Sequence, residues 1–104
     1  MDPILINAVV FQESGMWIAH CLEYNFVSFA ETRDELPHVL MKCIVAQIKG
    51  DLEAGHEPFF GFKPAPAKYW EMFEKAKLQS KPIRKSASVP ERNRVEAQLF
   101  PIAA

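Results

Sequence analysis

A short segment with two apolar faces sets the strongest constraint on how this 104-residue chain folds. Residues 4 to 12 (ILINAVVFQ) are rich in branched and aromatic side chains and too few for a stable isolated helix, so they predict a β-strand. Alternation places Ile4, Ile6, Ala8 and Val10 on one face and Leu5, Val9 and Phe11 on the other. One layer of helix covers only one face of a sheet. The second face must therefore be covered by the C-terminal segment, a second subunit or a partner protein.

Two further apolar segments predict a three-stranded antiparallel meander. Met16 to Leu22 follows the turn residues Glu13 to Gly15, and a short link that contains glycine between two such segments indicates a hairpin. Phe26 to Glu31 then predicts a third strand.

A capping box marks the start of a long helix. Thr32 is the expected N-cap, and Glu35 is the residue whose carboxylate reaches back to the Thr32 N–H. Pro37 would then stand at the fifth helical position, where it lacks the N–H that bonds to the preceding turn, so the first turn is kinked or Asp34 is the effective cap. An apolar stripe at spacings of three and four follows: Leu36, Leu40, Cys43, Ile44, Gln47, Ile48 and Leu52. Gly55 is the expected stop.

The remainder of the chain divides by composition. Residues 1–58 hold the meander and the helix, and residues 59–79 form an arm rich in aromatics and proline with a short amphipathic helix over 67–78. Residues 80–104 read as a basic tail, with a flexible linker over 80–93 and a terminal strand in which Val95 and Leu99 lie on one face. The expected fold class is α+β: a three-stranded antiparallel meander packed on one long helix, extended by these elements.

Length and charge indicate the kind of partner. A chain this small benefits from a second subunit, so we expect a homo-oligomer. Residues 1–62 contain nine acidic and three basic side chains, a net −6, whereas residues 63–104 contain four acidic and nine basic, a net +5. An acidic domain favours a basic partner, and a basic tail could contact phosphates. No membrane-spanning run or signal peptide is present, so the expected location is the cytoplasm and no membrane contact is expected.

The first 58 or so residues resemble the HicB antitoxin-like family. The resemblance rests on residues 15–19 (GMWIA) in the hairpin, residues 21–36 (CLEYNFVSFAETRDEL) at the junction of strand and helix, and residues 51–58 (DLEAGHEP) at the helix exit. It implies a partly degraded ribonuclease-H-like fold without nuclease activity, and a basic HicA-like toxin as the partner. Family members commonly carry a DNA-binding module at the C-terminus. Residues 59–104 contain no such pattern, so this domain is expected to act without one.

The residues do not predict catalysis. A ribonuclease-H-type site needs carboxylates that converge on Mg²⁺, typically with one in the middle of the first strand, and this strand offers Asn7 instead. The histidines and cysteines lack the spacing of metal ligands, so neither a metal nor another cofactor is expected. We therefore expect a protein that is not an enzyme.

Two groups of residues are candidates for binding. Trp17, His20, Glu23 and Tyr24 are the candidate contacts for the toxin-like partner. Phe59, Phe60, Phe62, Trp70 and Phe73 are expected to pack the arm on the domain or between subunits. Two alternatives remain open. The first is a small nucleic-acid-binding protein that uses the basic tail, and the second is a small-molecule site in an apolar pocket beneath the arm.

Overall fold

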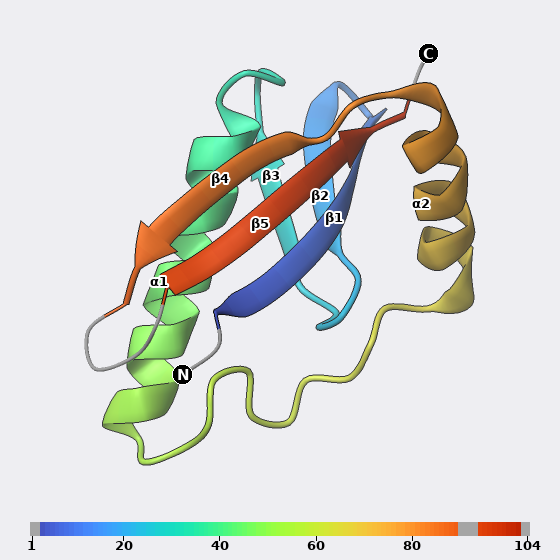
Figure 1. Cartoon of the computed structure of the whole chain (residues 1–104). Helices are drawn as coiled ribbons and strands as arrows, with labels where there is room; N and C mark the ends of the chain where they lie inside the picture. Colours follow the sequence, from blue (N-terminus) through green and yellow to red (C-terminus); the bar gives the residue numbers. More distant parts are fainter. Residues whose placement is uncertain (1–2, 90–93, 103–104) are drawn as a thin grey trace.

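The computed structural model describes residues 3–89 and 94–102, and its architecture is α+β (Figure 1). Within these residues the elements follow in the order β1 (Ile4–Glu13), β2 (Met16–Cys21), β3 (Val27–Ala30), α1 (Leu36–Glu53), α2 (Ala67–Gln79), β4 (Ile83–Ser88) and β5 (Arg94–Pro101). None of the described helices is long and apolar enough to cross a membrane.

The expected α+β class is confirmed, but the sheet has five strands and not three. The strand order is β3-β2-β1-β5-β4. β1, β2 and β3 pair consecutively and antiparallel, as the apolar segments predicted. β5 lies on the other side of β1 and runs parallel to it, and β4 pairs antiparallel with β5 at the outer edge. A parallel neighbour requires the chain to cross over the sheet, and that crossover includes α1.

The flexible linker predicted over residues 80–93 is wrong for residues 83–88, which form β4. Residues 90–93 of that prediction lie outside the described part of the chain. The terminal strand is present as β5, and it lies inside the sheet between β1 and β4. A boundary at residue 58 therefore does not separate folding units, because β5 from the predicted tail completes the hydrogen bonding of β1.

The hairpin between β1 and β2 has the tightest geometry that a hairpin allows. Glu13 pairs with Met16, which leaves two residues in the turn. Both have positive φ, 52° at Ser14 and 79° at Gly15, as a type I′ turn requires.

The helix α1 begins three residues later than the capping box predicts. The Glu35 N–H donates to Thr32 Oγ1 at 3.3 Å, and this hydroxyl donates to Glu35 Oε1 at 2.7 Å. These contacts form in a turn before the helix, and the N-cap position belongs to Glu35, which makes no side-chain capping bond. Thr32 and Asp34 are therefore both wrong as caps. The late start places Pro37 in the first turn, where its missing N–H has no helical partner to lose.

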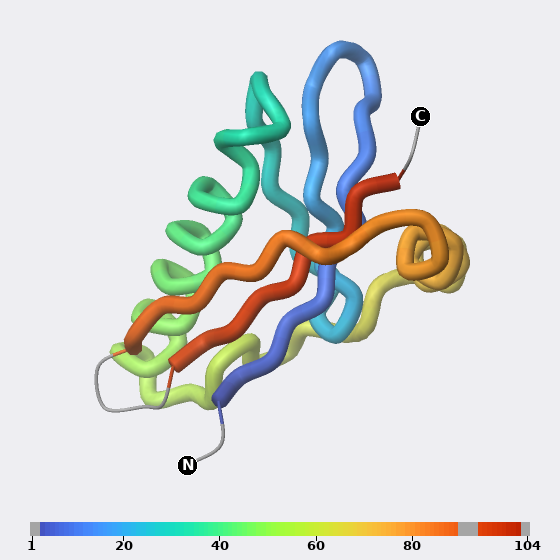
Figure 2. Tube along the Cα trace, turned by 45° about the horizontal axis from the view of Figure 1, so that its top comes forward, coloured from blue at the N-terminus to red at the C-terminus, as the bar shows by residue number. Residues whose placement is uncertain are grey.

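Each helix covers one face of the sheet (Figures 1 and 2). The stripe of α1 that includes Leu40, Ile44 and Ile48 packs on the face that carries Ile6 and Val10. α2 lies on the opposite face, in contact with β1 and β5. The residues of this second cluster are Val9, Leu22, Ala65, Phe73, Ala76 and Phe100. The chain's own segment after residue 64 thus covers part of the second face. This was one of the three possibilities that the sequence left open.

Candidate protein interaction surface

The four candidate partner contacts do not form one surface. Trp17 lies on the α1 face and packs against the larger core cluster. His20 lies on the opposite face, because three positions along a strand reverse the side-chain direction. Glu23 and Tyr24 belong to the link between β2 and β3.

His20 is buried beneath the first turn of α2. It is 6% exposed, and its ring stacks on Tyr69 with a centroid distance of 3.7 Å. His20 Nε2 lies 2.7 Å from Asn25 Oδ1. Burial lowers the pKa of His20 below its ordinary value of 6.5; the Asn25 contact opposes this shift, and the positive charge of Lys68 adds to it. The side chain therefore serves to dock α2 on the sheet.

Glu23 and Tyr24 are also occupied within the chain. The Glu23 carboxylate accepts from the backbone N–H and the Nδ2 of Asn7, both at 2.7 Å. This pair fastens the link between β2 and β3 to the middle of β1. The Tyr24 ring stacks on Phe59 at 4.4 Å between centroids, with 8° between their planes.

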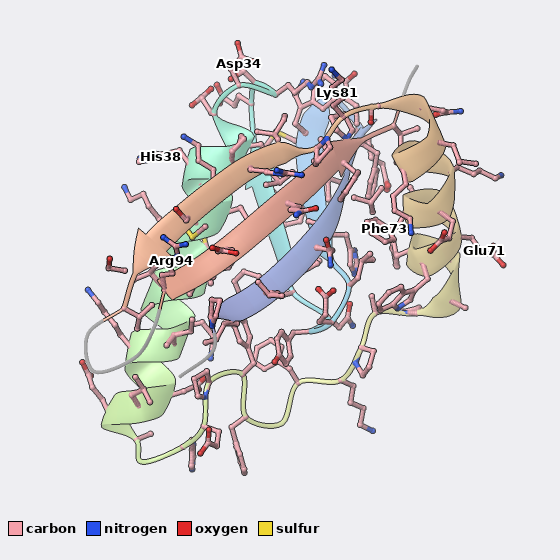
Figure 3. All side chains as sticks on the ribbon, viewed as in Figure 1. Asp34, His38, Glu71, Phe73, Lys81 and Arg94 are labelled. Carbon is pink, nitrogen blue, oxygen red and sulfur yellow. The ribbon has the colours of Figure 1, made fainter. Side chains whose placement is uncertain are left out.

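The aromatic arm packs mainly on its own domain. Phe59 and Phe62 join the core on the α1 side, and the Phe59 N–H donates to Asp51 Oδ2 at 2.7 Å. Phe73 points from α2 toward the sheet (Figure 3), where its ring meets Phe100 edge to face at 5.0 Å. Trp70 lies beside it, and Phe60 is 61% exposed and stacks on His56. All five rings therefore contact other residues of the chain, and Phe60 is the one that stays largely exposed.

An apolar patch remains on the second sheet face where α2 does not cover it. Phe11 pairs with Ile18 and Ile18 pairs with Phe29, so these side chains form a row across three strands. Phe29 is 56% exposed, and Met16 is exposed beside it. We call Met16, Val27 and Phe29 the Phe29 patch; Ile18 behind them is 9% exposed, and Phe11 at the end of the row stacks on Tyr69 of α2. The sequence predicts that β3 places Val27 and Phe29 on one face, but only the docking position of α2 shows that this face is open.

Carboxylates surround the hairpin end of the Phe29 patch. Glu13 pairs with Met16, and Glu31 follows the last residue of β3. Asp34 lies in the turn before α1 at the same end of the molecule (Figure 3). All three side chains are exposed, and Arg33 is the basic residue among them. The patch therefore combines an apolar centre with an acidic border.

The basic residues of the predicted tail gather at the other edge of the sheet. Lys81 precedes β4, Arg84 and Lys85 lie within it, and Arg94 begins β5. The Arg94 Nη2 atom lies 3.0 Å from Glu96 Oε1 in an exposed ion pair. Part of the charge difference between the two halves of the sequence thus becomes a separation across one sheet, while Lys68, Lys75 and Lys77 lie on α2.

The described residues contain no group of three histidine, cysteine or acidic side chains placed to hold a metal ion. Cys21 is buried, and Cys43 is half-buried on α1. Burial, with a contribution from Glu23, raises the pKa of Cys21 to about 12.

Comparisons of the chain with protein-family models, with curated proteins and with solved structures find no match. Its role has to be inferred from its own residues.

Proposed function

We propose that this chain is a non-catalytic protein-interaction domain of the HicB antitoxin type, which binds a basic partner through the Phe29 patch. The observation that carries the proposal is the exposure of Phe29. Its aromatic side chain is 56% exposed, whereas Ile18 beside it on β2 is 9% exposed and Phe11 on β1 packs against the α2 cluster. Exposed aromatic residues within a contiguous apolar patch are characteristic of protein interfaces.

The charge around the patch favours a basic partner. Glu13, Glu31 and Asp34 border it and are solvent-exposed. Complementary charge at the border speeds encounter and selects partners, while the aromatic centre supplies most of the binding energy. A small basic toxin of the HicA type has the required charge. The antiparallel order β1-β2-β3 with α1 on one face is consistent with the fold that the HicB resemblance implies.

A second copy of the chain is the competing occupant. Two copies that met through this patch would bring the carboxylates of Glu13 and Glu31 together, so a basic partner is the better complement. Homo-oligomerisation remains part of the proposal, through other parts of the second face such as the end where Leu5 is 58% exposed.

The test is co-expression of the tagged chain with a basic HicA-like protein encoded beside it. We expect the two to co-purify in 0.1 M salt. Phe29→Ser should abolish the complex, whereas Leu78→Ser should preserve it, because Leu78 is 89% exposed on α2 outside the patch. Circular dichroism of both variants shows whether the fold is retained. A complex that survives Phe29→Ser, or the absence of any adjacent basic reading frame, would refute the proposal.

A further inference from the structure

None of the described strands pairs with the outer edge of β4. β4 is the last strand in the sheet order, and β5 is its pairing partner. Arg84, Lys85 and Ser86 in its centre are exposed. Unpaired strand edges bind other extended chains unless charge, a bulge or a covering segment prevents it.

The direction of the backbone groups in β4 follows from two bonds at the end of β5. The Pro101 carbonyl accepts from Ser80 Oγ at 2.8 Å on the β4 side. The Ile102 N–H donates to the Val10 carbonyl at 2.9 Å on the β1 side. Successive residues of a strand direct their backbone groups to opposite sides. The odd-numbered residues of β5 therefore face β4.

This alternation identifies the free groups on β4. Ala97 faces Lys85, so Lys85 directs its N–H and C=O toward β5. Arg84, Ser86 and Ser88 consequently direct theirs toward the open edge. An extended segment that paired here would find three successive sets of backbone donors and acceptors.

Hollows lie beside β4 on both faces of the sheet. Between α1 and β4 is a groove of about 400 Å³ lined by His38, Met41, Lys42, Val45, Ala46, Lys49, Ala87 and Ser88. On the other face is a hollow of about 310 Å³ lined by Arg84, Lys85, Ser86, Arg94, Glu96, Ala97 and Gln98. The first has an apolar floor with two lysines at its border, and the second is polar with two arginines. A strand added to β4 would direct alternate side chains into the two hollows.

We propose that the β4 edge is a docking site for an extended peptide segment in which acidic and apolar residues alternate. The apolar side chains would enter the α1 groove over Met41 and Val45. The acidic ones would face Arg84 on the other side, beside the ion pair of Arg94 and Glu96. Main-chain hydrogen bonds supply affinity in such strand addition, and the two hollows supply specificity.

Charge and composition favour this occupant over two others. A second copy that paired β4 to β4 would place the basic residues of both copies together. Single-stranded nucleic acid binds through a positively charged groove combined with aromatic side chains on which the bases stack. Neither hollow has phenylalanine, tyrosine or tryptophan among its lining residues, and the apolar floor of the groove offers nothing to a phosphate. This site lies at the sheet edge opposite β3 and is independent of the Phe29 patch.

The experiment is a fluorescence anisotropy titration of the full chain with a labelled, end-blocked octapeptide that alternates glutamate and valine. We expect saturable binding, weaker by severalfold in 0.5 M salt. A peptide that alternates lysine and valine should bind at least tenfold more weakly. Failure of the acidic peptide to bind, or equal binding of the two peptides, would overturn the proposal.

Two pairs of variants locate the site. Ser86→Pro removes an N–H that the fold does not use and should weaken binding about tenfold, whereas Ser86→Ala keeps that N–H and should bind normally. Arg84→Glu should weaken binding severalfold, because Arg84 faces the acidic side chains of the peptide, and Lys75→Glu on α2 should not. If Ser86→Pro does not fold, the peptide with alternate amides methylated replaces it and is expected not to bind.

The remaining outcomes contradict the proposal. A folded Ser86→Pro that binds as well as the parent chain would exclude the strand edge. A 12-nucleotide RNA that binds more tightly than the peptide and depends on Arg84 would identify a nucleic-acid site. A dimer that Ser86→Pro dissociates in sedimentation would identify a second copy as the occupant.

Discussion

Phe73→Ala tests how much the packing of α2 on the sheet contributes to the free energy of unfolding. Phe73 is 7% exposed and packs edge to face on Trp70 and on Phe100. Replacing a buried phenylalanine by alanine typically costs about 3–5 kcal/mol, which includes the loss of aromatic pair contacts. The Lys77 Nζ lies 4.8 Å from the ring centre, and its stem can fill part of the cavity. We therefore expect the lower end, about 3 kcal/mol of unfolding free energy.

Urea unfolding followed by circular dichroism is the assay. With an m-value of about 1.5 kcal/mol/M, a loss of 3 kcal/mol lowers the midpoint by about 2 M. Leu78→Ala is the matched control on the same helix, and we expect a change within about 0.5 kcal/mol because that side chain is 89% exposed.

The two tryptophans report on the two faces of the sheet. Trp17 packs in the core on the α1 side, and Trp70 packs in the cluster beneath α2. If α2 and the sheet unfold together, the emission of Trp70 in a Trp17→Phe background should change at the same urea concentration as that of Trp17 in a Trp70→Phe background. Equal costs for Phe73→Ala and Leu78→Ala, or an earlier Trp70 transition, would refute the reasoning.

Three further predictions concern single residues. Burial lowers the pKa of His20, so protonation opposes folding: stability should fall as the pH drops from 7.5 to 5.5, and His20→Gln should flatten this dependence in urea titrations at both pH values. Because its pKa is about 12, buried Cys21 should resist iodoacetamide at pH 8 while Cys43 is modified, and mass spectrometry should find both alkylated in guanidinium. Gly50→Ala should stabilise by about 0.5–1 kcal/mol in a helix position with open space, whereas Gly15→Ala should cost about 1 kcal/mol because φ there is 79°, and opposite shifts in melting temperature would check both.

The local part of the fold was predictable from the sequence. The two faces of β1 follow from alternation alone, and the structure places Ile6 and Val10 on the α1 side and Val9 on the α2 side. The stripe of α1 follows from its period in the same way. The predicted start of α1 was wrong because the capping box and Pro37 favour different first residues, and the constraint from Pro37 outweighs the capping box.

The composition of residues 83–88 did not predict that they form β4, the edge strand of the sheet. The segment around β4 is polar and basic and has a proline at each end, Pro82 and Pro90, which is also the composition of a linker. Edge strands use the same charges and prolines to discourage pairing with other chains. What distinguishes the two is the pairing of β4 with β5 and of β5 with β1, and pairing between distant segments leaves no local pattern.

The candidate interaction surfaces were likewise predictable from the sequence only in part. The acidic border and the basic edge follow from counting charges in each half of the chain. The exposure of Phe29 depends on where α2 docks, and the burial of His20 depends on Tyr69, which lies 49 positions further along the chain. The position of β5 also rules out truncation as a test of nucleic-acid binding by the basic tail. Removing residues 81–104 would delete the parallel neighbour of β1 and expose Ile6 and Val10, so point variants on β4 are required.

The two proposed surfaces lead to a last prediction, that they bind independently. β3 and β4 are the two ends of the sheet order, with three strands between them. A basic partner on the Phe29 patch and an acidic peptide on the β4 edge would therefore not overlap. Saturation with the acidic octapeptide should leave the affinity for the basic partner within about twofold, since separated exposed charges are screened at physiological salt. Competition in an anisotropy titration would mean that one segment of the partner occupies both places, and Phe29→Ser together with Arg84→Glu would then show which contact it needs.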